Sequence, residues 1–191
     1  MPTKNFSSVG GYSVGAKEVL NTSLELKNIS AIHMTSDNFT DASHDKYIVK
    51  RVTDSANNTL QLTLDGATAI AGNSAALAAN TVAFIKARVF GQDTANNTYV
   101  YASVYDLVVT TTAGGAPTVA AVYENIIRNN PPGQEDWSVT PDAFQIGSAP
   151  YFTFEVKSVT ASSTVKWLSL IHISEPTRLR RISYAVFCLK K

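Results

Sequence analysis

Short segments of alternating apolar and polar residues, separated by polar turns, constrain this chain most. In VAFIKARVFG (82–91), Ala83, Ile85, Ala87 and Val89 share one strand face, and the opposite face carries Lys86 and Arg88. Further strands are predicted at 23–35, 46–53, 59–66, 98–111, 118–128, 137–147, 151–160 and 163–167. About nine short strands with turn residues between them predict an all-β fold, an antiparallel β-sandwich or jelly-roll.

The remaining segments predict how the strands are connected. Residues 1–23 are rich in Gly, Ser and Asn and predict an arm or loop, and the polar stretch 36–45 predicts a loop. A turn of Asn, Asp and Ser between 46–53 and 59–66 predicts a hairpin. The alanine-rich segment 67–80 has room for one short helix. We therefore expect one domain over 24–167.

The C-terminal segment 168–191 resembles translated sequencing-adapter DNA. LSLIHISEPTR (168–178) can be back-translated into a transposase-type library adapter, and ISYAVFCL (182–189) into the flow-cell adapter that follows it. The three residues between them match the codons that a leftover base and an index would fill. We expect this tail to be non-native and exclude it from the argument about function. The native C-terminus is then unknown, and a closing strand is expected after Trp167.

Charge and cysteine content exclude several classes of protein once this tail is set aside. The rest of the chain has eleven basic and fourteen acidic residues, a net charge of −3, so the basic surface typical of a nucleic-acid binder is not expected. The one cysteine, Cys188, lies in the tail, which leaves no disulfide and no thiolate metal site. No segment has the length of a membrane-spanning helix, and the N-terminus has no apolar signal segment.

From Val82 to Trp167 the order of motifs resembles β-rich virion proteins of tailed bacteriophages. The motifs are FIKARVFGQD, YVYASVYDLVVT, VYENIIRNN, EDWSVTPDAFQ, FTFEVKSVT and STVKW. The resemblance implies a structural, non-enzymatic module of a tail fibre or other appendage that is assembled in the host cytoplasm and carried in the virion. Implied partners are other virion proteins, further copies of the chain and a host surface glycan.

Two other functions are compatible with the same strands. One is a stand-alone carbohydrate-binding module or bacterial surface adhesin. The other is a virion-associated polysaccharide hydrolase, which needs two carboxylates at a suitable separation. Candidates for that pair are Glu124, Glu135, Asp136 and Asp142. The sequence has neither a G-x-S-x-G nor an H-E-x-x-H motif, so we expect no enzyme.

The densest polar cluster, SDNFTDASHD (36–45), is a candidate cation site. Asp37, Asp41 and Asp45 offer the oxygen ligands that calcium prefers, with His33 and His44 nearby. Their spacing differs from the D-x-D-x-D-G calcium loop, so a solvated loop is the simpler interpretation. No other cofactor is expected.

Aromatic side chains give two further candidates. Tyr99, Tyr101 and Tyr105 share one face of a strand, with Tyr123 near them, and exposed tyrosines can bind sugar faces; packing within the sheet is the alternative. Trp137 and Trp167 are expected in the core. Lys86 and Arg88 share a face with Phe84 and Phe90, which is compatible with a surface for an acidic ligand or with an ordinary solvent-facing surface.

Overall fold

The computed structural model describes residues 12–14, 17–20, 29–36, 39–54, 58–114, 117–131, 137–158 and 164–175. These ranges form strands β1 to β12 and one short 3-10 turn, Ala71–Asn73. They contain no α-helix, and hence no helix that could cross a membrane.

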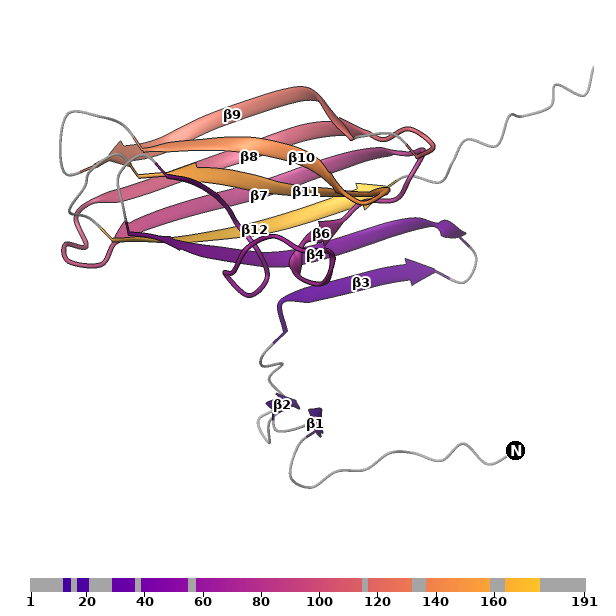
Figure 1. Ribbon diagram of the computed structural model, residues 1–191, viewed down its shortest axis with the longest axis horizontal. Coiled ribbons are helices and arrows are strands. Elements are labelled where there is room, and N and C mark those ends of the chain that lie inside the picture. Colours follow the sequence, from indigo (N-terminus) through magenta and orange to yellow (C-terminus); the bar gives the residue numbers. More distant parts are fainter. Residues whose placement is uncertain are drawn as a thin grey trace, which may run out of the picture.

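Two antiparallel sheets face each other (Figure 1). The larger has six strands in the order β3 (Ala31–Ser36), β4 (Phe39–Thr53), β12 (Val165–Glu175), β7 (Val82–Asp93), β8 (Val100–Thr110) and β9 (Thr118–Asn130). The smaller consists of β10 (Ser138–Ile146), β11 (Ala149–Lys157), β5 (Thr59–Gln61) and β6 (Ala75–Ala76), the last two both pairing with β11. A separate two-stranded sheet joins β1 (Tyr12–Val14) and β2 (Lys17–Leu20).

Strict alternation along the strands decides which face of the larger sheet is buried. Odd-numbered residues of β7 are buried and even-numbered ones exposed over its whole length, and β12 follows the same parity. Successive side chains of a strand point to opposite faces, so the odd positions form an inner face against the smaller sheet. The even positions form what we call the outer face. The predicted faces of the 82–91 strand are confirmed.

A layer of aromatic rings fills the space between the sheets. Trp167 of β12 contacts both Trp137 and Tyr101, with ring centroids 5.7 Å apart in each case. Tyr105 of β8 contacts Phe154 of β11 at 4.8 Å, which connects the two sheets directly. These rings are almost fully buried, so the prediction that Trp137 and Trp167 belong to the core is confirmed. The all-β sandwich predicted from the sequence is likewise confirmed.

Two connections differ from the sequence prediction. The segment 36–45, predicted as a loop, is largely strand, because β4 begins at Phe39 and pairs with β3 through its polar residues. The predicted hairpin of 46–53 with 59–66 is wrong: β4 lies in the larger sheet and β5 in the smaller one, joined by a single bridge between Lys50 and Thr63. Alternation indicates strands but does not identify which strands pair.

The segment 67–80 contains little regular structure. The one short helix for which the sequence had room is the 3-10 turn Ala71–Asn73, and the two-residue strand β6 follows it. Asn73 is buried, and its side-chain amide donates to Asp65 at 2.8 Å and to the Thr68 carbonyl at 3.0 Å. Hydrogen bonds from one buried side chain therefore shape this connection.

The structure has a strand at Val165–Glu175, between β4 and β7, and residues 168–175 of this strand belong to the adapter-like segment. It is thus a central strand of the larger sheet. Ile171 and Ile173 fill core positions, but the buried Ser169 hydroxyl has no hydrogen-bond partner. Burial raises the pKa of Glu175, whose carboxylate accepts a hydrogen bond from the Ala78 amide at 2.8 Å. The apolar side chains on the inner side of this strand therefore pack in the core, whereas its buried polar side chains are less well satisfied by hydrogen bonds.

Gly91 is needed where β7 passes the Trp167 ring. A Cβ atom at Gly91 would lie 2.6 Å from Trp167 Cζ3, closer than side chains tolerate. We expect Gly91→Ala to lower the free energy of unfolding by about 1–3 kcal/mol, as overpacking does in other cores. Denaturant unfolding measures this. Gly72→Ala is the control, because a Cβ there meets nothing within 4 Å; equal stability of the two variants would contradict the packing described.

Candidate binding surface

The outer face of the larger sheet carries positive charge among exposed apolar side chains. In its strands, the described outer-facing residues include six cations and one acid, Asp106. The cations are Lys46, Lys50, Lys86, Arg88, Arg128 and Lys166. Large apolar side chains that are substantially exposed between them include Ile48, Val52, Phe84, Phe90 and Leu168. Exposed apolar side chains gathered among cations on one face make this face the candidate binding surface.

Strand register brings these cations and apolar groups side by side. Across the sheet, Lys50 of β4 is level with Leu168 of β12 and Phe90 of β7. One step along the strands, Lys166 lies between Val52 and Gln92. Neighbouring strands lie about 4.8 Å apart, so each cation has an apolar neighbour within side-chain reach. The outer face therefore combines both kinds of contact within the footprint of one ligand.

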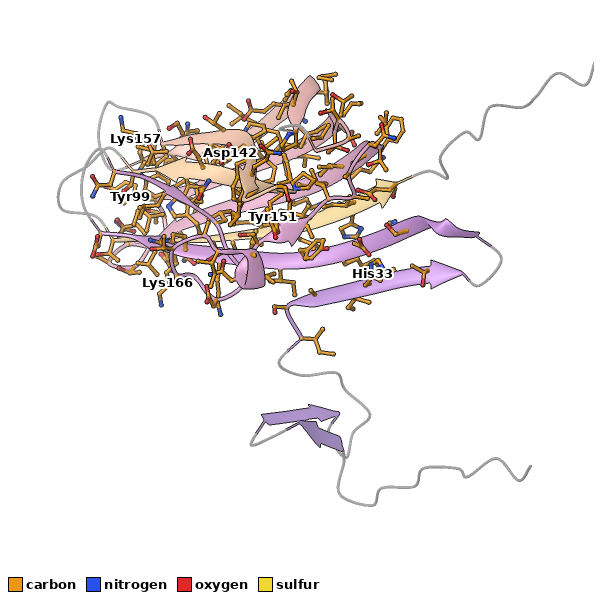
Figure 2. All side chains as sticks on the ribbon, turned by 45° about the vertical axis from the view of Figure 1, so that its right-hand side comes forward. His33, Tyr99, Asp142, Tyr151, Lys157 and Lys166 are labelled. Atoms are coloured by element: carbon orange, nitrogen blue, oxygen red, sulfur yellow. The ribbon has the colours of Figure 1, made fainter. Side chains whose placement is uncertain are left out.

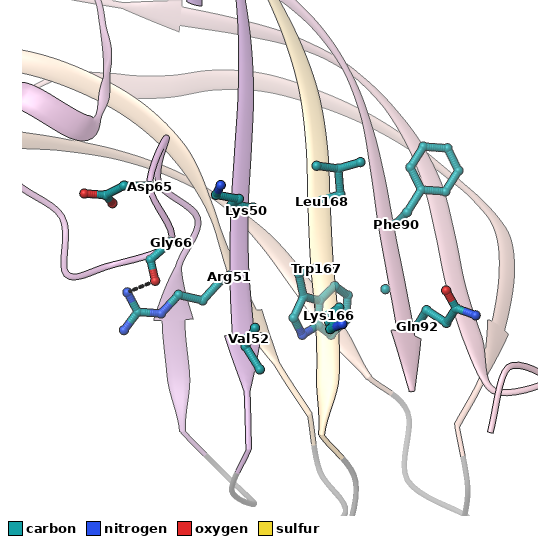
Figure 3. Close-up of a pocket in the computed structure, with 11 residues that line it drawn as sticks. Lys50, Arg51, Val52, Asp65, Gly66, Phe90, Gln92, Lys166, Trp167 and Leu168 are labelled. Carbon is teal, nitrogen blue, oxygen red and sulfur yellow. Dashed lines mark hydrogen bonds between the residues drawn. The ribbon is translucent and has the colours of Figure 1, made fainter. Parts of the chain in front are cut away.

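Two hollows lie on the outer face. The first, about 490 Å³, is bounded by Lys50 and Val52 of β4, Phe90 of β7, and Lys166 and Leu168 of β12 (Figure 3). The acidic residue Asp65 also lines it. At its side, Arg51 donates a hydrogen bond to the Gly66 carbonyl at 3.1 Å. This bond occupies one guanidinium nitrogen of Arg51 with the chain itself.

The second hollow, also about 490 Å³, lies further along the same strands. It is lined by Lys86 and Arg88 of β7, Val104 and Asp106 of β8, and His172. Lys86 Nζ lies 3.6 Å from the Asp106 carboxylate, and both side chains are largely exposed. An exposed pair of this kind contributes little to stability, and Asp106 offsets only one of the cations. The surface keeps a positive balance that can attract an anionic ligand.

The sequence identified part of this surface. Lys86, Arg88, Phe84 and Phe90 were expected on one face, and the structure confirms that arrangement. What the sequence analysis missed is the contribution of β4 and β12. The even spacing of Lys46, Ile48, Lys50 and Val52 could have indicated that they share a face.

Three of the four candidate tyrosines are not surface residues. Tyr101 and Tyr105 are buried, and Tyr99 is partly buried against the core. Their odd positions in and beside β8 turn them toward the smaller sheet, so packing accounts for them and sugar binding at the surface does not. Tyr123 is exposed but lies on the outer side of β9, opposite Asp106, and not beside the other three.

The two buried tyrosines hold a carboxylate at the inner side of β9. The Tyr105 hydroxyl donates to Glu124 Oε1, and the Tyr101 hydroxyl donates to the same oxygen at 3.1 Å. Burial, and then the hydrogen bond to Glu124, raise the pKa of Tyr105; burial also raises the pKa of Tyr101. Both phenols are therefore protonated donors at neutral pH. They tie the centre of β9 to β8.

The calcium prediction is tested only at Asp45. Its buried carboxylate accepts a hydrogen bond from His33 and lies 3.5 Å from the Ser43 hydroxyl; His33 is labelled between β3 and β4 in Figure 2. Asp37 and the side chain of Asp41 lie outside the described residues. Within the described residues, no three His, Cys, Asp or Glu side chains lie close enough together to hold a metal ion. The calcium site remains a prediction.

Of the carboxylates considered for hydrolysis, two can be placed. Glu124 is on the inner side of β9, and Asp142 is on the outer side of β10, where it accepts a hydrogen bond from Gln61 at 2.6 Å. They do not face a common space. Glu135 and Asp136 lie outside the described residues. Asp142 instead neighbours Glu155 of β11, whose pKa is raised by burial and then by the charge of Asp142.

Comparisons with known proteins found similarity only at the level of structure. No family model matches the chain, and the search of curated proteins found no match. Tailspike protein gp49 of Acinetobacter baumannii bacteriophage Fri1, described as a capsular polysaccharide depolymerase, matches with 13% identity and a TM-score of 0.38 over 77% of this chain and 21% of that one. The tailspike protein of Acinetobacter baumannii phage AM24 matches with 14% identity and a TM-score of 0.29 over 66% and 26%. The chain thus has a distant structural match to phage tailspikes and spans about a quarter or less of each.

The Asp142–Glu155 pair predicts a pH effect. The raised pKa of Glu155 means that the folded state favours its protonated form, so this group's contribution to stability is present at low pH and lost as pH rises through the raised value. Asp142→Asn keeps an oxygen for Gln61 but removes the charge. We expect the pKa of Glu155 to fall toward its ordinary value in an NMR titration. Asp106→Asn, on the other sheet, should leave it unchanged; a pKa insensitive to Asp142→Asn would contradict the pairing.

Proposed function

We propose that this chain is a structural, non-enzymatic module of a bacteriophage tail appendage, and that it takes part in host attachment through the outer face of its larger sheet. The observation that carries the attachment role is the outer face itself, whose strands present six cations, one acid and exposed apolar side chains, with Asp65 beside the first hollow. The phage assignment rests on the motifs between Val82 and Trp167. In this proposal the module resides in the virion beside other virion proteins.

The proposed ligand is an anionic glycan of the host surface. Sugar rings have apolar faces that can lie on side chains such as Phe84 and Phe90, while acidic groups on the glycan meet the lysines and Arg88. All six cations precede Leu168, whereas the strand that joins β4 to β7, Val165–Glu175, lies mostly in the adapter-like segment.

Because this surface is exposed to solvent, we expect a single module to have a low affinity for its ligand. Exposed charge pairs contribute roughly 0.2–1 kcal/mol each, so one module binds weakly. Several modules on one appendage gain avidity because later contacts form at high effective concentration. Such a surface suits reversible adhesion by many copies better than tight binding by one.

Binding to immobilised dextran sulfate, with neutral dextran as the reference polymer, tests this proposal. We expect binding to dextran sulfate that weakens with added salt, because counter-ions screen exposed charges. The double charge reversal Lys86→Glu with Arg88→Glu should weaken binding by about tenfold, since two attractive contacts become repulsive.

The control is Lys157→Glu on the smaller sheet (Figure 2), which is matched in charge to the single reversal Lys86→Glu on the outer face. It should retain most of the binding. Equal binding to neutral dextran, or a loss with Lys157→Glu as large as that of an outer-face lysine, would show that the outer face is not the binding surface.

A further inference from the structure

The edges of the two sheets are unequal. In the larger sheet, the edge strand β3 has six residues, whereas β9 at the other edge has thirteen. In the smaller sheet, one edge is made by the three residues of β5 and the two of β6. The other edge, β10, contains Pro141, and a proline is tolerated in a strand where its nitrogen faces away from the neighbouring strand. Short strands and prolines discourage pairing with another chain, and β9 has neither. Two bulges interrupt its pairing with β8, so its regular stretch is 121–126.

Strand β9 also exposes apolar side chains on both of its sides. Val122 and Ile126 point to the inner side and are each 50% exposed, because the smaller sheet does not reach over them. Tyr123 on the outer side is 63% exposed, and Ile127, at a bulge in the pairing with β8, is 65% exposed. Figure 1 shows β9 along the rim of the molecule, beyond β8. Among the described residues, no strand pairs with this edge of β9, and its apolar side chains are exposed there.

Strand β9 is fixed to the core by hydrogen bonds, and its residues carry no net charge. Glu124 is bonded to Tyr101 and Tyr105, so the centre of β9 is fixed to the core and does not need a partner to become ordered. Its charged residues are Glu124 and Arg128, which balance each other. A second β9 therefore meets no net repulsion, unlike a second outer face, where cations would oppose cations.

We propose that β9 pairs with β9 of a second copy of this chain in antiparallel orientation, joining two larger sheets edge to edge about a two-fold axis. The pairing satisfies the free backbone groups of both strands. It also continues the inner apolar surface, since a two-fold axis perpendicular to the sheets keeps the inner sides together. Each copy has one such edge, so the assembly closes at two copies and does not grow into a filament.

This pairing has a consequence for the outer faces. Edge-to-edge joining leaves both outer faces open on the same side of one continuous sheet. The dimer would therefore present two adjacent copies of the basic surface. The dimer does not depend on the attachment function, and each can fail without the other.

Light scattering coupled to size-exclusion chromatography on the full chain tests the interface. We expect a dimer, and we expect the double variant Ile126→Lys with Ile127→Lys to be monomeric, because two lysines per edge would face each other. Both isoleucines are half or more exposed, so the variant should fold, and circular dichroism checks this. Val52→Lys, which places a charge at a similarly exposed position of the outer face, should remain dimeric.

A spin label at Asn125→Cys in a Cys188→Ser background gives a second readout. Paired edges bring the two β9 strands to about 5 Å, so a short label-to-label distance is expected, and it should disappear in the lysine variant. A monomeric wild type, a trimer, or a dimer that survives both lysines with long label distances would overturn the proposal. Loss of dextran sulfate binding with the dimer intact would overturn the attachment function alone.

Discussion

The aromatic contact between the two sheets is the interaction on which the rest of the structure depends. Trp167 lies against Trp137 and Tyr101, and Tyr105 lies against Phe154. Burial of aromatic side chains is among the largest favourable terms in a core, so these contacts decide which side of each strand faces inward. Because the odd-numbered side chains of β7 and β12 point into this aromatic layer, the even-numbered side chains must point to the opposite face, toward solvent.

The smaller sheet is narrower than the larger one, and this mismatch produces both exposed surfaces. Four strands, two of them very short, cover the centre of a six-stranded sheet. The inner side of β9 extends beyond this cover and leaves Val122 and Ile126 half exposed. The whole outer face has no layer over it among the described residues. Charge then separates the two surfaces: the outer face is strongly basic, whereas the β9 edge is balanced and apolar.

Much of the fold could be predicted from local alternation, and the failures have a common physical cause. The faces of 82–91 and the burial of both tryptophans follow from side-chain periodicity, which is a property of one strand. Which strands pair with each other depends on both strands and cannot be read from one of them. The polar stretch 36–45 looked like a loop because its strand is completed by contacts such as His33 with Asp45. Tyr101 and Tyr105 showed a shared face, but whether that face is covered depends on β11, some fifty residues later in the chain. From the sequence, the binding surface could be predicted in β7 only. Lys50 and Lys166 belong to the same surface because of how the strands align in the sheet, and the sequence of one strand does not determine that alignment.

Hydroxyl-radical footprinting with mass spectrometry tests the central claim most directly, because it reports the solvent access of individual side chains. We predict rapid oxidation of Phe84 and Phe90 on the outer face and strong protection of Tyr101 and Tyr105 in the free chain. Adding dextran sulfate should protect Phe84 and Phe90 while leaving Tyr123 on the β9 strand reactive. Protection of both phenylalanines in the free chain to the level of Tyr105, or oxidation of the two tyrosines at the rate of Tyr123, would contradict a sandwich with one buried and one open face.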